Sequence, residues 1–116
     1  MDNPIKITRE EVRLKVLGLL DLEPALSQRD ISCRLGISLG SVNYCLKALV
    51  EKGWIKVNNF RRSDNKLAYA YILTPHGVTE KTLLTKRFLQ RKVIEYESLK
   101  SEIAKLKAQI GESDIF

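Results

Sequence analysis

The sequence predicts a mainly α-helical fold with a small β-hairpin, in the α+β class, followed by a long C-terminal helix. Within the first 53 residues, helix start and stop signals bracket three short segments. Two stretches rich in β-forming residues then flank a polar turn. A run of about 34 residues without an internal proline follows, enough for a helix of roughly 50 Å. The chain of 116 residues has room for one small domain and this extra element.

The first two helices are expected at about residues 9–20 and 28–35. Residues 8–11, TREE, have the form of a capping box, and apolar residues recur after them at helical spacing. The first helix should end before Pro24, because the residue that precedes a proline disfavours the helical conformation. Ser27 is a favourable N-cap for the second helix, and the glycine after its last residue suits the left-handed conformation that often ends a helix.

A third helix forms the centre of residues 36–57, GISLGSVNYCLKALVEKGWIKV. Ser38 is its expected N-cap and Gly53 its stop, and apolar residues spaced at i, i+4 and i+7 from Val42 give it a buried stripe. A face rich in hydrogen-bonding groups lies opposite: Gly40, Ser41, Asn43, Tyr44 and Lys47. A face that is only solvated would carry more glutamate and lysine. These side chains and the Ser38 cap are therefore candidate contacts to a partner.

The β-hairpin is expected from residues 54–59 and 68–73, with a polar turn between them. Residues 54–73 carry four basic side chains and one acidic side chain, the densest positive excess in the chain. The basic residues in or beside the turn are Arg61, Arg62 and Lys66. A solvated loop could have this composition, but a basic hairpin directly after a helix-turn-helix is more typical of a wing that contacts nucleic acid.

Composition argues against several classes of function. The formal net charge of +6 and the isoelectric point near 9.4 are compatible with a polyanionic partner. One histidine, no glycine-rich phosphate loop and no catalytic pair of carboxylates leave no basis for an enzyme. The cysteines form no CxxC pattern, so neither a metal nor another cofactor is expected. Without a signal-peptide pattern or an apolar run of roughly 20 residues, a cytoplasmic protein is expected.

The two cysteines, Cys33 and Cys45, both fall in expected helices. The simpler interpretation is that both are small buried apolar residues. The alternative is a thiol switch near the partner surface, because Cys45 lies on the third helix.

The last helix, residues 75–110, begins after a threonine N-cap and ends at Gly111. From residue 89, alternating steps of three and four meet apolar residues at six of seven positions, which predicts a coiled-coil seam. The seam consists of Leu89, Tyr96, Leu99, Ile103, Leu106 and Ile110, and Lys92 interrupts it. The later heptads place isoleucine at a and leucine at d, the combination favoured in parallel dimers.

Charged residues beside the seam also favour a parallel pair of helices. In that orientation Glu95 of one chain meets Lys100 of the other, and Glu102 meets Lys107. An antiparallel pair would oppose like charges instead. The alternative is a single amphipathic helix that folds back on its own domain.

These patterns divide the chain into a winged helix-turn-helix domain at residues 8–74 and a dimerisation helix at residues 75–110. Three apolar residues of the long helix precede the seam: Val78, Leu84 and Phe88. We expect them to pack against the first domain.

The segments LSQRDISCRLGISLGSVNYCLKALVEKGWIKV and LTPHG, with a hairpin between them, resemble the MarR family of winged-helix transcriptional regulators. REEVRLKVLGLL, VNYCLKAL and NKLAYAYILTPHG are similar to the small EPS-associated MarR-like regulators, and this resemblance spans about residues 8–106. It implies a bacterial regulator linked to exopolysaccharide gene clusters. The chain departs from larger members in having few residues before the first helix, where they dimerise. Their wing often has an acidic–x–arginine arrangement, where this chain has Asp64-Asn65-Lys66.

We therefore expect a homodimeric, sequence-specific regulator that binds double-stranded DNA at a palindromic operator. The third helix would enter the major groove, with Ser41, Asn43, Tyr44 and Lys47 nearest the base edges or adjacent phosphates. The backbone amides at the start of that helix would face phosphates, together with Ser38, Arg29, Arg34 and the basic residues of the wing. The rival hypothesis is a winged-helix module that binds another protein and no DNA.

Overall fold

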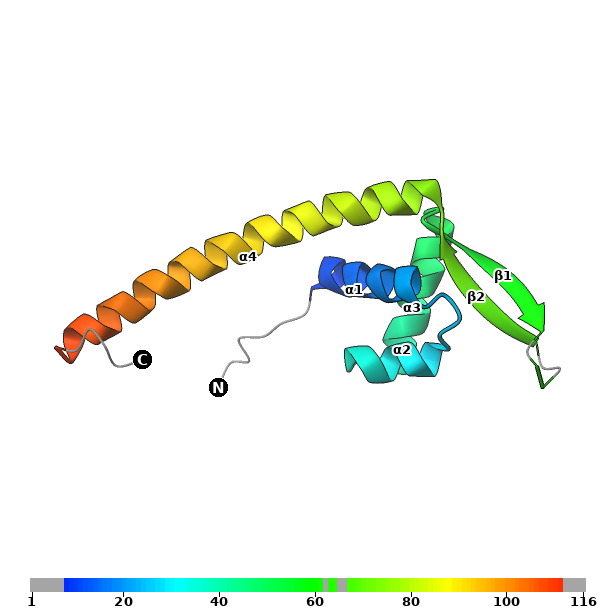
Figure 1. Cartoon of the computed structure of the whole chain (residues 1–116), viewed down its shortest axis with the longest axis horizontal. Helices are drawn as coiled ribbons and strands as arrows, with labels where there is room; N and C mark the ends of the chain where they lie inside the picture. Colours follow the sequence, from blue (N-terminus) through cyan, green and yellow to red (C-terminus); the bar gives the residue numbers. More distant parts are fainter. Residues whose placement is uncertain (1–7, 62, 65–66, 112–116) are drawn as a thin grey trace. The chain divides into compact units, whose positions relative to one another are not determined.

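The computed structural model describes residues 8–61, 63–64 and 67–111, and the elements follow the expected order (Figure 1). They are α1 (Arg9–Leu22), α2 (Gln28–Leu35), α3 (Leu39–Glu51), β1 (Ile55–Arg61), β2 (Leu67–Leu73) and α4 (Pro75–Gln109). The described residues up to Leu84 form one compact unit, and those from Thr85 onwards form a second. The fold is a winged helix-turn-helix, mainly helical with a two-stranded antiparallel hairpin, followed by a long helix.

Each of the three short helices begins at a capping hydroxyl. The Thr8 hydroxyl accepts a hydrogen bond from the Glu11 amide at 3.1 Å. Ser27 forms a reciprocal capping box, in which its hydroxyl accepts from the Asp30 amide and the Asp30 carboxylate accepts from the Ser27 amide. Hydrogen bonds from the Ser27 side chain and backbone, helped by a nearby arginine, hold the pKa of Asp30 below its ordinary value. These caps explain why three helix starts could be predicted from the sequence.

The turn between α2 and α3 depends on Gly36. Its φ of 67° lies in the left-handed region, and its amide donates to the Ser32 carbonyl at 2.9 Å. The Ser32 hydroxyl donates to the Ile37 carbonyl at 2.5 Å, which closes the turn from the other side. The hydroxyl of Ser38 then caps α3 by accepting from the Ser41 amide at 3.1 Å. This turn fixes the direction in which α3 leaves α2.

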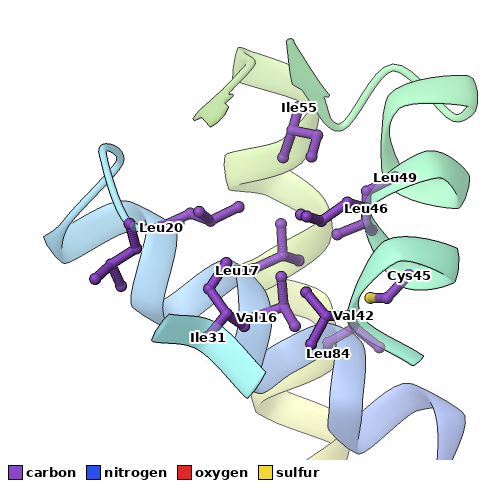
Figure 2. Close-up of a cluster of buried hydrophobic side chains, with 11 residues drawn as sticks. Val16, Leu17, Leu20, Ile31, Val42, Cys45, Leu46, Leu49, Ile55 and Leu84 are labelled. Atoms are coloured by element: carbon purple, nitrogen blue, oxygen red, sulfur yellow. The ribbon is translucent and has the colours of Figure 1, made fainter. Parts of the chain in front are cut away.

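A single apolar cluster holds the first unit together (Figure 2). The expected stripe of α3 is present, since Val42, Leu46 and Leu49 are each at most 2% exposed. The cluster also takes side chains from α1, α2, β1 and the first turns of α4: Val16, Leu17, Leu20, Ile31, Ile55 and Leu84. Full burial of each such side chain stabilises the fold by about 1.5–3 kcal/mol. The cluster therefore leaves only the opposite face of α3 to solvent.

The hairpin is anchored at its base to the helices. The Tyr71 amide donates to the Pro24 carbonyl at 3.1 Å, and the Thr74 amide donates to the Trp54 carbonyl at 2.9 Å. The strands extend further towards the turn than expected, because Arg61 still pairs with Leu67 at the last position of the ladder. The ladder therefore extends the outer part of the hairpin, the wing, beyond the base that these two contacts hold.

The start of α4 packs closely on the backbone before β1. A Cβ placed on Gly77 would lie 1.9 Å from the carbonyl oxygen of Trp54, so only glycine permits this approach. Leu84, two turns further along the same helix face, is 4% exposed, which confirms its expected packing in the core. The expectation for Val78 is wrong: it is 51% exposed, because the neighbouring Gly77 occupies the buried side of this turn.

The boundaries of α1 and the placement of one cysteine also differ from expectation. α1 ends at Leu22 rather than Leu20, so it runs up to the residue that precedes Pro24. Cys45 is buried as expected, but Cys33 is exposed. Cys33 lies two residues after the buried Ile31, which is roughly 200° around a helix and therefore away from the core.

Candidate nucleic-acid interface

The exposed face of α3 is a narrow strip opposite the core. Gly40, Tyr44 and Lys47 recur at i, i+4 and i+7, and all three are exposed, with Tyr44 at 64%. Ser41 is exposed beside this strip, and its hydroxyl accepts a hydrogen bond from the Ser38 hydroxyl at 2.9 Å. The strip therefore presents a phenol, an ammonium group and hydroxyls on one solvent-facing surface.

Gly40 stands in open space. A Cβ at this position would meet nothing closer than the Ser38 hydroxyl oxygen at 4.0 Å, and its φ is not in the left-handed region. The fold itself therefore does not require glycine here, although glycine lowers helix stability relative to alanine. The missing side chain leaves the backbone of α3 accessible from outside.

Asn43 lies on the flank of α3 rather than in the middle of the exposed strip. It is half-buried, and its Nδ2 donates to the Oε1 of Gln28, the first residue of α2, at 3.2 Å. The Nε2 of Gln28 donates in turn to the Tyr71 hydroxyl on β2, also at 3.2 Å. Sequence reasoning did not identify Gln28 or Tyr71, because these contacts join residues 15 and 43 positions apart and no local pattern marks them.

The N-terminal end of α3 differs from those of its neighbours in its charge. α1 carries Glu10 and Glu11 in its first turn and α2 carries Asp30, whereas α3 carries no acidic residue there. The partial positive charge of a helix start is therefore not offset on α3 by an acidic side chain of its own. An anion such as a phosphate is favoured at such an end.

The structure shows an ion pair with a carboxylate for one of the two arginines of α2. Arg29 is exposed. Arg34 is also exposed, but its guanidinium lies 3.0 Å from the carboxylate of Glu23. Because both partners are about half exposed, this ion pair contributes little to stability. A phosphate could therefore replace Glu23 as the partner of Arg34 at small cost.

Arg61 ends β1 and is exposed at the outer end of the hairpin ladder. Strand alternation places Arg61 on the hairpin face that includes Val57, and Val57 pairs with Tyr71. Val57, Tyr71, Asn43 and Lys47 line one groove of about 400 Å³ between the hairpin and α3. The expected contacts at Arg62 and Lys66 lie outside the described residues.

The thiol of Cys45 points into the core, and burial raises its pKa above the ordinary value. This shift disfavours the thiolate, the form that reacts in a redox switch. Among the described residues, no group of three or more histidine, cysteine, aspartate or glutamate side chains could hold a metal ion. The helices of the described segments include none long and apolar enough to cross a membrane.

The seam residues of α4 are exposed in the single chain. The exposed fractions are 61% for Leu89, 59% for Tyr96, 54% for Leu99, 40% for Ile103, 55% for Leu106 and 60% for Ile110. Lys92, which interrupts them, places its Nζ 3.2 Å from the Glu95 carboxylate and 5.1 Å from the Phe88 ring centre. An apolar stripe of this length on an isolated helix is typical of a surface that another chain covers.

Residues 9–56 match the family described as winged helix-turn-helix DNA-binding. These residues span α1, α2, α3 and the first positions of β1. No curated protein matches the chain.

Several solved structures share the fold. The smu.1704 protein of Streptococcus mutans UA159 superposes with a TM-score of 0.75 at 17% identity, over 84% of this chain and 94% of that chain. A MarR transcriptional regulator of Methanosarcina mazei Go1 gives 0.61 at 20% identity, over 86% and 73%. A MarR/EmrR family transcriptional regulator of Acinetobacter sp. ADP1 gives 0.55 at 24% identity, over 85% and 74%. The architecture is thus that of winged helix-turn-helix proteins, and its structural neighbours include MarR-family regulators.

Proposed function

We propose that this protein is a sequence-specific transcriptional regulator that binds double-stranded DNA as a homodimer. The observation that carries the proposal is the exposed strip of Gly40, Tyr44 and Lys47 on α3 of a winged helix-turn-helix. The strip is polar, lacks a side chain where the backbone is most open, and is followed in the chain by a basic hairpin. MarR-type architecture among the structural neighbours supports the same role.

In this proposal α3 lies in the major groove of B-DNA. Tyr44, Lys47 and Ser41 reach base edges or the phosphates beside them, and Lys47 is suited to the acceptors of guanine. Asn43 pairs with adenine through its amide. The start of α3, with the hydroxyl of Ser38, faces a phosphate, because its positive end has no acidic neighbour in its own first turn.

Basic residues on both sides of α3 hold the phosphate backbone. Arg29 and Arg34 contact it from α2, and Arg34 exchanges Glu23 for a phosphate on binding. Arg61, Arg62 and Lys66 contact phosphates or the minor groove from the wing. These contacts set the affinity and the salt dependence, and the α3 contacts set the sequence preference.

The dimer forms through a parallel coiled coil of α4. The proposed division into a DNA-binding domain and a dimerisation helix falls between residues 74 and 75, where α4 begins, and the first turns of α4 up to Leu84 pack within the first compact unit. The seam from Leu89 to Ile110 buries its exposed apolar side chains against a second copy. The flanking pairs Glu95–Lys100 and Glu102–Lys107 select the parallel orientation. A two-fold dimer then reads a palindromic operator with half-sites about one DNA turn, roughly 34 Å, apart.

The regulated genes and the compartment belong to the same proposal. The similarity of VNYCLKAL and NKLAYAYILTPHG to EPS-associated regulators supports exopolysaccharide genes as the target. Action on bacterial promoter DNA requires a cytoplasmic protein. The proposal includes neither catalysis nor a cofactor.

A salt titration tests the proposal, with binding to a fluorescent duplex of random sequence followed by anisotropy. Wild-type protein should bind, and Arg61→Ala/Arg62→Ala should weaken binding to every duplex. The slope of log affinity against log salt should fall by roughly 0.9 for each phosphate contact that is lost.

The matched control is Lys86→Ala/Lys105→Ala, which removes the same charge from exposed positions on α4. It should retain the wild-type slope. Equal slopes for both variants would reject the wing contact. A stable dimer with no affinity for DNA even at low salt would reject the whole proposal and favour a module that binds another protein.

A further inference from the structure

A chain of three side chains joins the wing to α3. The amide of Asn43 donates to the amide of Gln28 at 3.2 Å, and the amide of Gln28 donates to the hydroxyl of Tyr71 at 3.2 Å. The three residues come from α3, α2 and β2, and both contacts are partly buried. We call these residues, Asn43, Gln28 and Tyr71, the amide relay.

In the structure, the hydrogen bonds of the amide relay run from Asn43 through Gln28 to Tyr71. Gln28 accepts with Oε1 from Asn43, so its NH2 group is the end that faces the Tyr71 oxygen. If the Gln28 amide were reversed, its NH2 group would face the NH2 group of Asn43, and the hydrogen bond between them would be lost. A tyrosine hydroxyl can donate or accept, so reversing both amides together would also satisfy the chain. The relay therefore holds the Gln28 and Asn43 side chains in place, and the Asn43 amide keeps a donor and an acceptor for a base in either direction.

Two members of the relay, Gln28 and Tyr71, lie on backbone that other contacts hold in place. Gln28 lies inside the capping box of Ser27 and Asp30 at the start of α2. The Tyr71 amide donates to the Pro24 carbonyl at 3.1 Å, which ties this point of β2 to the loop before α2. A tyrosine ring also has few rotatable bonds. The hydrogen-bond partner of Asn43 therefore belongs to a fixed support rather than to mobile surface side chains.

We infer that Gln28 and Tyr71 are positioning residues for base recognition, which hold the Asn43 side chain in place for pairing with adenine. The relay uses one Nδ2 hydrogen of Asn43 and leaves the second hydrogen and Oδ1 available. Adenine presents N7 as an acceptor and N6 as a donor, which matches that pair. Guanine presents two acceptors and no donor for Oδ1, so it can form only one of these two hydrogen bonds with the Asn43 amide. The inference rests on the proposed DNA-binding function.

Tyr71→Phe removes the hydroxyl at the end of the amide relay and keeps the aromatic ring. Tyr69→Phe is its matched control, because Tyr69 lies on the same strand and the same hairpin face but outside the relay. The relay itself is measured without DNA, from the side-chain NH2 signals of Gln28 and Asn43 in an NMR spectrum of the full chain. Tyr71→Phe should shift both signals, and Tyr69→Phe should leave them in place. Unshifted signals in Tyr71→Phe would overturn the relay.

Base recognition is measured on a duplex selected by wild-type protein from a random library and on variants of it with each base pair replaced. Asn43→Ala should abolish the preference at one A·T pair in each half-site. Tyr71→Phe should reduce the preference at that same pair by about three- to tenfold, the effect expected for one neutral hydrogen bond. Affinity for random DNA and the salt slope should stay at their wild-type values.

A double-substitution cycle separates positioning from a general structural role. Adding Tyr71→Phe to Asn43→Ala should cause no further loss of preference, because the relay acts through Asn43. An additive loss, an equal loss on random DNA, or a wild-type preference in Tyr71→Phe would overturn the inference. If wild-type protein selects no duplex, the proposed function itself fails, and the NMR signals still report separately whether the relay forms.

Discussion

At the scale of single residues, Gly40 is a glycine that the fold does not require and that the proposed DNA binding would use. Its site has space for a side chain, and its backbone conformation does not call for glycine. The fold does require glycine at two other positions. Gly36 has a positive φ, and Gly77 lies against the Trp54 carbonyl. A glycine that lowers helix stability without a structural reason is consistent with close approach of a partner to α3.

Gly40→Ala should therefore stabilise the protein and weaken its binding to DNA. Alanine in place of a glycine in a helix interior raises the free energy of unfolding by about 0.5–1 kcal/mol, and Gly40 in the first turn of α3 should gain up to that amount. The added methyl group would stand between α3 and the groove, so affinity for the selected duplex should fall. Urea denaturation and anisotropy measure the two effects.

Gly18→Ala is the control, because Gly18 lies within α1 and a Cβ at this position would meet no atom within 4 Å. It should stabilise the protein by a similar amount and bind DNA as the wild type does. Wild-type affinity in Gly40→Ala would show that the exposed backbone of α3 is not approached closely.

The residues that the sequence identified correctly are those that act locally. Ser27, Ser38 and Gly36 are bonded to residues at most a few positions away, so their spacing alone predicts their roles. Gln28 and Tyr71 act across the fold, so their roles emerge only when α2, α3 and β2 are brought together. The exposure of Cys33 was missed because the buried face of α2 is marked by few apolar residues.

At the scale of elements, the apolar side chains of the long helix α4 change from buried to exposed along its length. Its first turns supply Gly77 and Leu84 to the compact first unit. From Leu89 its apolar stripe is exposed in the single chain. Lys92 at the start of the stripe bonds to Glu95 of its own helix, so the proposed seam is best formed in the heptads from Tyr96 onwards.

Charge reversal at Glu102 tests the orientation of the proposed coiled coil. In a parallel dimer, Glu102→Lys opposes Lys107 of the second chain twice and should weaken the dimer. Each exposed pair is worth about 0.2–1 kcal/mol, so the effect is clearest at low salt. Adding Lys107→Glu should restore the wild-type dimer. Sedimentation equilibrium of the full chain measures both changes.

Glu97→Lys is the control for this reversal, since Glu97 is exposed on the outer side of the heptad pattern and changes the net charge equally. It should leave the dimer unchanged. A stronger dimer in Glu102→Lys would indicate antiparallel pairing with residue 102 opposite Glu95 of the second chain, because the substitution there replaces two like charges by an ion pair.

Element order could be predicted from the sequence almost completely, and element ends less well. Caps, glycine stops and the alternation of the strands are local, and they placed all six elements. The hairpin runs further than expected because Arg61, which looked like part of a polar turn, gains a ladder partner in Leu67. Val78 was expected inside because it is apolar, but packing at Gly77 turns it outward.

At the scale of the whole molecule, the proposed regulator combines a DNA-binding unit with a helix that pairs two copies. The match over residues 9–56 and the shared fold support the first part. The charge pattern and exposed seam of α4 support the second. A palindromic operator follows only if both are correct, since a two-fold protein presents two copies of α3 related by the same symmetry.

Methylation interference on the selected duplex tests the central claim that α3 binds in the major groove. Dimethyl sulfate methylates guanine N7 in the major groove and adenine N3 in the minor groove. Interference is expected at guanines in two symmetric clusters about one DNA turn, roughly 34 Å, apart. Absence of any retarded complex at low salt, or interference confined to minor-groove adenines, would contradict it.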